Sequence, residues 1–180
     1  MAFVSLREVA ARAGVSHGAP AHHFGNKQGL LTAFAADGYR RLADAMGTAR
    51  RARGPSSGPS GPLQRVGRGY VRFAVDNPEH FAIMFQVDAL DAGDSDLRQA
   101  ADSAYQFLRE AVAGFPVKRR RRHRPEAIAL AAWSMVHGLA MLWMSGRVGS
   151  RRAGPHRLAA VLCRVFAEGL LSASMSTKRR

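Results

Sequence analysis

Apolar residues recur at intervals of three and four along most of the chain, which is the spacing of helices that bury one face. The clearest early example is the face formed by Leu31, Phe34, Gly38, Leu42 and Met46. It predicts a long helix from about Lys27 to Arg51. The same spacing predicts further helices over residues 63–75, 78–87, 95–113, 125–144 and 158–170. The pattern therefore predicts an all-α fold.

Two shorter helices are predicted before the long one, joined by a tight turn. Ser5 and Glu8 have the spacing of a capping box, so a helix is expected to begin at Leu6. Gly14 suits a helix C-cap, and Ser16 is expected to cap a second helix over residues 17–24. This is the layout of a helix-turn-helix, whose second helix enters the DNA major groove, although an ordinary αα-hairpin has the same spacing.

Charge favours a nucleic-acid partner. The 180 residues carry a formal net charge of +14, and no acidic residue stands between Ala10 and Gln28. An anionic membrane surface is the alternative partner. The lone Cys163 excludes an internal disulfide and is expected in the core. No secretory signal is visible at the N-terminus, so a cytoplasmic location is expected.

The first part of the chain resembles the TetR family of transcriptional regulators over about residues 5–46. The residues that carry the resemblance are S-L-R-E-V-A-A-R-A-G-V-S, then H-H-F-G-N-K and G-L-L. A looser resemblance over residues 63–170 is to the WHG subgroup of that family. It rests on Trp133-Ser-Met-Val-His137-Gly138 and on Asn77-Pro-Glu-His-Phe81.

This resemblance implies a helix-turn-helix DNA-binding head joined by a long helix to a helical ligand-binding and dimerisation domain. The head is expected over residues 1–46, with the helix-turn-helix at about 5–24, and the regulatory domain over residues 47–180. The expected DNA contacts lie around the second helix: Ser5, Ser16, His17, Gly18, Ala19, Ala21, His22 and Lys27. Ala21 departs from the family, which usually has Tyr there, and Pro20 gives up an amide that would bond to the Ser16 carbonyl.

The resemblance also implies a small, apolar effector and a homodimer. The residues that could wall an effector pocket are Phe81, Met84, Phe85, Tyr105, Trp133, His137 and Met141. Such residues more often form plain core, and a histidine such as His137 is more often a core residue that donates to a backbone carbonyl. The last helix has a regular apolar face, which is expected to form the dimer interface through Leu158, Val161, Leu162, Val165, Phe166 and Gly169.

Three other segments have alternative interpretations. Residues 54–62 are rich in Gly, Pro and Ser and are expected to be a linker, and residues 173–180 a frayed tail. The basic run 118–124 suits either a solvated loop or a second nucleic-acid contact. Residues 127–144 are apolar and just reach the length of a membrane span, but Ser134 and His137 in mid-segment favour a buried helix.

The sequence thus predicts a dimeric DNA-binding repressor that binds a palindromic operator and is released by an effector. A non-specific basic protein that coats nucleic acid is the competing class. An enzyme is not expected, because no nucleophile elbow or phosphate loop appears, and neither a metal site nor a cofactor is expected. The family carries a further helix before this motif, and only four residues precede Ser5 here, so we expect this sequence to lack that helix. We therefore expect a start upstream of Met1, and loose DNA binding by the shortened form.

Overall fold

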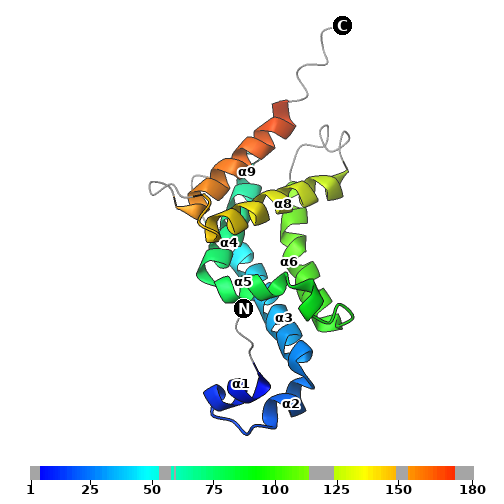
Figure 1. The fold of residues 1–180 in the computed structure, drawn as a ribbon. Helices are drawn as coiled ribbons and strands as arrows, with labels where there is room; N and C mark the ends of the chain where they lie inside the picture. The colour runs from blue at the N-terminus through cyan, green and yellow to red at the C-terminus, as the bar shows by residue number, and fades with distance from the viewer. Residues whose placement is uncertain (1–4, 53–57, 59, 114–123, 149–153, 173–180) are drawn as a thin grey trace.

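Helices make up the secondary structure of the residues that the computed structural model describes, which are 5–52, 58, 60–113, 124–148 and 154–172. The all-α prediction is confirmed for this part of the chain. A small head and a larger helical body lie towards opposite ends of one long helix (Figure 1). In chain order the elements are α1 Leu6–Ala13, α2 Ala19–Phe24, α3 Lys27–Arg51, α4 Gly61–Asp76, α5 Pro78–Met84, the 3₁₀ helix η1 Val87–Ala89, α6 Ser95–Ala113, α8 Pro125–Met144 and α9 Pro155–Ser172.

Local capping sets the ends of the head helices. The Ser5 hydroxyl accepts from the Glu8 amide at 3.2 Å, and the Glu8 carboxylate accepts from the Ser5 amide at 3.0 Å. Gly14 ends α1 in the left-handed conformation, with φ at 67°. The Asn26 side chain accepts from the Gly29 amide at 2.9 Å and starts α3. The capping box, the glycine C-cap and the Asn26 cap are therefore as the sequence predicts.

The second helix begins later than predicted, and Ser16 does not cap it. The Ser16 carbonyl instead accepts from the Ala19 amide at 3.0 Å in a turn, and Gly18 takes the N-cap position. Pro20 then lies in the first turn of α2, where a missing amide costs no intrahelical hydrogen bond. The expected loss of a Pro20 bond to Ser16 was therefore wrong.

The long helix α3 runs unbroken from the head into the body (Figure 1). Helices α4, α5 and α6 all contact it. Besides Thr32, its buried residues are small or apolar: Ala35, Ala36, Gly38, Leu42, Met46 and Gly47. Helix α3 therefore joins the head directly to three helices of the body, α4, α5 and α6.

Helix α4 begins at Gly61, so the last two residues of the predicted linker are helical. Pro62 fits there because a helix start has no use for its amide. The predicted linker otherwise falls largely outside the described residues. Two glycines of α4 permit close packing: an added Cβ on Gly67 would meet the Cys163 sulfur at 2.5 Å, and one on Gly69 the Met46 Cα at 2.9 Å.

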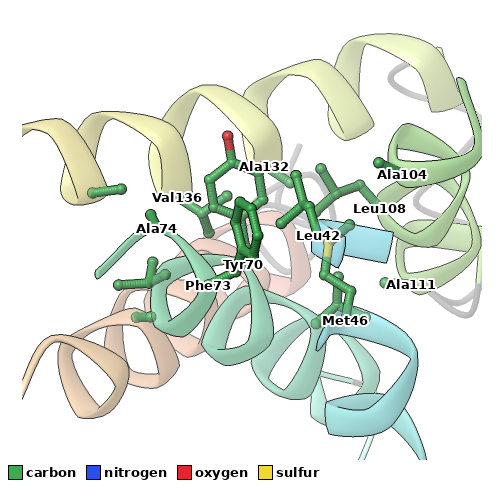
Figure 2. Close-up of a cluster of buried hydrophobic side chains, with 14 of the residues drawn as sticks. Leu42, Met46, Tyr70, Phe73, Ala74, Ala104, Leu108, Ala111, Ala132 and Val136 are labelled. Atoms are coloured by element: carbon green, nitrogen blue, oxygen red, sulfur yellow. The ribbon is translucent and has the colours of Figure 1, made fainter. Parts of the chain in front are cut away.

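The body core lies where α3, α4, α6 and α8 meet (Figure 2). Tyr70 of α4 points its hydroxyl towards α8, beside Val136 and Ala132 (Figure 2). Cys163 of α9 is fully buried, as predicted, and burial raises the pKa of its thiol to about 12. Helix α8 is long and apolar enough to span a membrane, but its inner face, which includes Val136, packs in this core.

The fifth helix is shorter than predicted and ends at Met84 rather than Val87. The chain after it is held against the start of α3 instead. The Gln28 side chain donates to the Leu90 carbonyl at 3.2 Å, and the Thr32 hydroxyl accepts from the Asp91 amide at 2.9 Å. These tertiary contacts, absent from the periodic pattern, redirect the backbone. Most of the basic run 118–124 and the predicted tail 173–180 lie outside the described residues.

Candidate DNA interface and effector cavity

The turn before α2 and the outer side of α2 form an exposed surface. His17, Gly18, Ala21 and His22 are all exposed, and Ala19 is half-buried. Ser16 is also exposed, but its backbone carbonyl is used in the turn. The nearest acidic residues in sequence are Glu8 and Asp37, on either side of this segment. The surface is therefore compatible with a close approach to phosphates.

Ser5 is placed less favourably for a phosphate than the sequence suggests. Its hydroxyl and its amide both bond to Glu8 in the capping box. The backbone amide of Ser5, followed by its hydroxyl, lowers the pKa of the Glu8 carboxyl. A charged carboxylate thus stands beside Ser5 at neutral pH, where it would repel a phosphate.

The corner between α2 and α3 depends on a glycine. An added Cβ on Gly29 would overlap the carbonyl oxygen of Phe24, the last residue of α2. Gly25 turns the chain with φ at 74°, and Asn26 caps α3. Lys27 is exposed at the first position of α3. The corner therefore fixes the position of Lys27 relative to the exposed turn.

The body contains a small aromatic cavity of about 60 Å³ between α3, α4, α6 and α8. Of the predicted pocket residues, Phe85, Tyr105 and Trp133 line it. Phe81 and Met84 are buried in the adjoining core, and His137 stands beside Phe85, with ring centroids 4.4 Å apart. Met141 lies apart from them, half exposed on α8. The remaining lining residues are Tyr39, Leu42, Met46, Tyr70, Ala101, Ala104 and Leu108.

A hydrogen-bonded chain joins α4 to α8 at the edge of this cavity. Trp133 Nε1 donates to the Tyr70 hydroxyl at 3.1 Å, and that hydroxyl lies 3.0 Å from His137 Nδ1. Indole is a donor only, so the Tyr70 hydroxyl accepts from Trp133, and it donates to His137 Nδ1 when the neutral imidazole carries its proton on Nε2. Burial lowers the pKa of His137 and raises that of Tyr70, so both are neutral near pH 7. The structure thus shows a tyrosine hydroxyl as the partner of His137 Nδ1.

Tyr39 and Tyr70 are the residues with a polar group among the lining residues that sequence reasoning missed. Tyr70 lies within the helix predicted over residues 63–75, and Tyr39 stands beside Gly38 in the long helix. The Tyr39 hydroxyl donates to the Met84 carbonyl at 3.2 Å and so links α3 to the end of α5. A tyrosine inside an apolar stripe was the available signal, because its hydroxyl needs a partner when buried.

The predicted dimer residues divide between two environments. Val161, Leu162 and Val165 are exposed on α9, and Met141 and Leu142 are exposed on the neighbouring α8. Leu158 and Phe166 are half-buried and pack against the body core instead. Gly169 is exposed near the end of α9. Fewer of the predicted residues are therefore exposed on α9 than expected, and the neighbouring α8 carries further exposed apolar side chains.

Family comparisons agree with both halves of this description. Residues 63–166, more than half of the chain, match the model described as "Tetracyclin repressor-like, C-terminal domain". Residues 1–34 match the model described as "Bacterial regulatory proteins, tetR family". A comparison with curated proteins found no match.

Solved structures share the fold over most of their length. A protein of unknown function from Rhodococcus sp. RHA1 is 27% identical with a TM-score of 0.73, covering 92% of this chain and 84% of its own. A tetR-family bacterial regulatory protein from Rhodococcus RHA1 is 19% identical with a TM-score of 0.67, covering 93% and 86%. The TetR family transcriptional regulator PfmR from Thermus thermophilus is 20% identical with a TM-score of 0.61, covering 94% and 85%. The chain therefore belongs to the tetR family of bacterial regulatory proteins and is a DNA-binding transcriptional regulator.

Proposed function

We propose that this regulator is a homodimeric, cytoplasmic repressor that binds a palindromic operator and is released by a small apolar effector. The observation that carries the proposal is the exposed turn and outer side of α2, with His17, Gly18, Ala21 and His22 accessible. In a helix-turn-helix, such residues approach base edges while flanking cations contact phosphates. We propose that Lys27, which is exposed at the start of α3, contacts a DNA phosphate.

The exposed apolar face of α8 and α9 supports the dimer. Val161, Leu162 and Val165 lie on α9, and Met141 and Leu142 on α8. An isologous interface buries the same patch on both copies, so one such face is enough to pair two chains. Pairing would bring two heads together, as a palindrome with two half-sites requires. Contact between two copies would also explain the apolar surface of α8 without insertion into a membrane.

Effector binding is proposed at the aromatic cavity, which must open to accept a ligand. Its 60 Å³ has room for one or two water molecules, whereas pockets for organic ligands measure about 300–1,000 Å³. Phe85 and Trp133 are both half-buried side chains at its wall. Their displacement is the simplest route to a larger cavity, and an aromatic lining favours an apolar ligand.

Contacts between α5 and α3 provide a route from the cavity to the head. Met84 of α5 lies against Gly38, where an added Cβ would meet its sulfur at 2.7 Å. His80 stacks on Phe34 with ring centroids 4.0 Å apart, and its Nε2 lies 3.1 Å from an Asp37 carboxylate oxygen. A shift of α5 would therefore displace α3, and with it the spacing of two heads. Each tenfold loss of operator affinity requires about 1.4 kcal/mol of coupling.

The test compares the affinity of the protein for a palindromic fragment upstream of its gene with that for a shuffled duplex of equal length. We expect the palindromic fragment to bind at least a hundredfold more tightly at physiological salt, with two chains per duplex. A footprint on the same fragment would locate the half-sites. Equal affinity for both duplexes would overturn specific repression and support the competing class, a non-specific nucleic-acid-binding protein.

A further inference from the structure

A groove outside the aromatic cavity lies where α3 and α4 cross and reaches the first turn of α9. Its volume is about 570 Å³, within the range of small-molecule sites. Helices α4 and α9 run beside each other at this place (Figure 1). The groove shares none of its lining residues with the aromatic cavity. It is therefore a separate opening in the same domain.

The close crossing of the two helices produces the groove. An added Cβ on Gly69 would lie 2.9 Å from the Ala45 carbonyl oxygen and 3.0 Å from the Ala49 Cβ, so the backbones nearly touch. The same small residues, together with Ala52, line the groove. Because none of them has a side chain beyond Cβ, they leave a shallow apolar floor beside the crossing.

Three arginines of α4 converge on this floor. Arg65, Arg68 and Arg72 recur at intervals of three and four, so they share one helix face. Arg65 Nε donates to the Arg50 carbonyl at 3.1 Å, which holds its guanidinium at the end of α3. Arg72 forms an exposed pair with Asp76 at 3.3 Å, a weak contact in water.

The remaining polar residues leave the groove positively charged. The described residues that line the groove include one acidic residue, Asp44, and three arginines. His156 of α9 also lines it and adds a ring nitrogen. Guanidinium groups bind carboxylates and phosphates through two parallel hydrogen bonds, whereas a lysine offers only a point charge. The groove thus combines a planar anion-binding rim with an apolar floor.

We propose that this groove binds a small organic anion, with a carboxylate or phosphate head on the arginines and a short apolar body over the alanines. The proposal does not depend on the repressor function or on the aromatic cavity. A concave site of this volume favours a small molecule over the phosphates of a duplex, which needs an extended convex or helical surface.

The binding test uses the full chain without DNA and three probes: hexyl phosphate, inorganic phosphate and 1-hexanol. Isothermal titration calorimetry is expected to show one hexyl phosphate per chain, bound at least tenfold more tightly than inorganic phosphate, with no binding of hexanol. Equal affinity for the two phosphates would overturn the role of the apolar floor. Hexanoate in place of hexyl phosphate then shows which head group the arginines prefer.

Variants locate the site. Arg72→Gln and Arg68→Gln should each weaken hexyl phosphate binding at least tenfold. Thr48→Phe should do so as well, because it fills the exposed end of the groove without changing charge. Arg98→Gln, which removes the same charge from an exposed position on α6, is the matched control and should have no effect. If the variant of the half-buried Arg68 does not fold, the variants of the exposed Arg72 and Thr48 still show whether the groove binds hexyl phosphate.

Two results would overturn the proposal. Equal losses in the Arg72 and Arg98 variants, with none for Thr48→Phe, would mean that the net charge of +14 attracts the anion without a site. A fall in duplex DNA affinity on Arg72→Gln, without a change in hexyl phosphate affinity, would assign the arginines to nucleic acid instead.

Discussion

A Cβ on Gly29 would overlap the carbonyl oxygen of Phe24, so only glycine fits where the second helix of the DNA-binding motif meets α3. Gly29→Ala should therefore push α2 away from α3 and lose about 1–3 kcal/mol of local stability to overpacking. We expect operator affinity to fall at least tenfold. Hydrogen exchange should show faster exchange in α2 and unchanged protection in the body.

The control for this substitution is Gly138→Ala in the middle of α8. No atom outside the neighbouring backbone lies within 4 Å of an added Cβ there. Alanine also favours a helix over glycine by about 1 kcal/mol, so this variant should be neutral or slightly more stable. Wild-type DNA affinity in the Gly29 variant would show that the corner tolerates a different angle.

Lys27→Ala should weaken binding to every DNA sequence by a similar factor. A lysine that neutralises one phosphate releases about one counterion, so the salt dependence should flatten by about one unit per half-site. Fluorescence anisotropy titrations at several salt concentrations measure this slope. The exposed Arg98→Ala, on α6, should leave it unchanged. A slope identical to the wild type would remove Lys27 from the contacts.

Val165→Asp should break the proposed dimer. Val165 is 57% exposed on α9 within the apolar face, so the isolated chain tolerates the change while a seam between two copies does not. Sedimentation at micromolar concentration should show dimers for the wild type and monomers for the variant. Val87→Asp, at a valine 73% exposed in η1, is the matched control and should stay dimeric. A monomeric wild type would rule out this interface.

Tyr70→Phe should lower the free energy of unfolding by about 1–3 kcal/mol, because it leaves the Trp133 and His137 nitrogens without their shared partner. Denaturant unfolding followed by tryptophan emission measures the change. Tyr105→Phe alters a tyrosine that lines the same cavity but has no hydroxyl hydrogen bond within the described residues. It should cost much less. Equal losses in both variants would mean that the chain of hydrogen bonds adds little.

Acidification should destabilise the body through His137. Burial lowers the pKa of this histidine below its ordinary value of 6.5, so the unfolded chain binds a proton that the folded chain refuses. The free energy of unfolding should therefore fall as the pH drops below about 6.5. His137→Gln should reduce this slope, whereas the exposed His23→Gln should not. An unchanged slope in the His137 variant would assign the pH dependence to other groups.

Local signals in the sequence predicted local structure well. The Ser5–Glu8 capping box, the Gly14 C-cap and the Asn26 cap each depend on residues within four positions of one another, and all three are present. The prediction that Ser16 caps the second helix was wrong, because Gly18 and Pro20 allow α2 to begin later. Nothing local distinguishes those two starts.

Features that depend on distant contacts were harder to predict. The early end of α5 follows from Gln28 and Thr32, which hold a loop about sixty residues away. Periodicity finds the apolar face of α9 but cannot say that Phe166 meets the core while Val165 does not. Arginines spaced along a helix are typical of a solvated face. The sequence therefore did not predict the groove at Arg65, Arg68 and Arg72.

The close crossing at Gly69 makes α3 a lever. We take the pivot to be near Met46, where an added Cβ on Gly69 would lie only 2.9 Å from the Met46 Cα. At about 1.5 Å per residue, Gly38 lies about 12 Å from that point and Lys27 about 28 Å. A sideways push of about 1 Å by Met84 at Gly38 would thus move the start of the helix by more than 2 Å. That distance is enough to separate a lysine from a phosphate within hydrogen-bond range. In the proposed release mechanism, a ligand that widens the cavity by only part of an atom's width would therefore shift the start of α3.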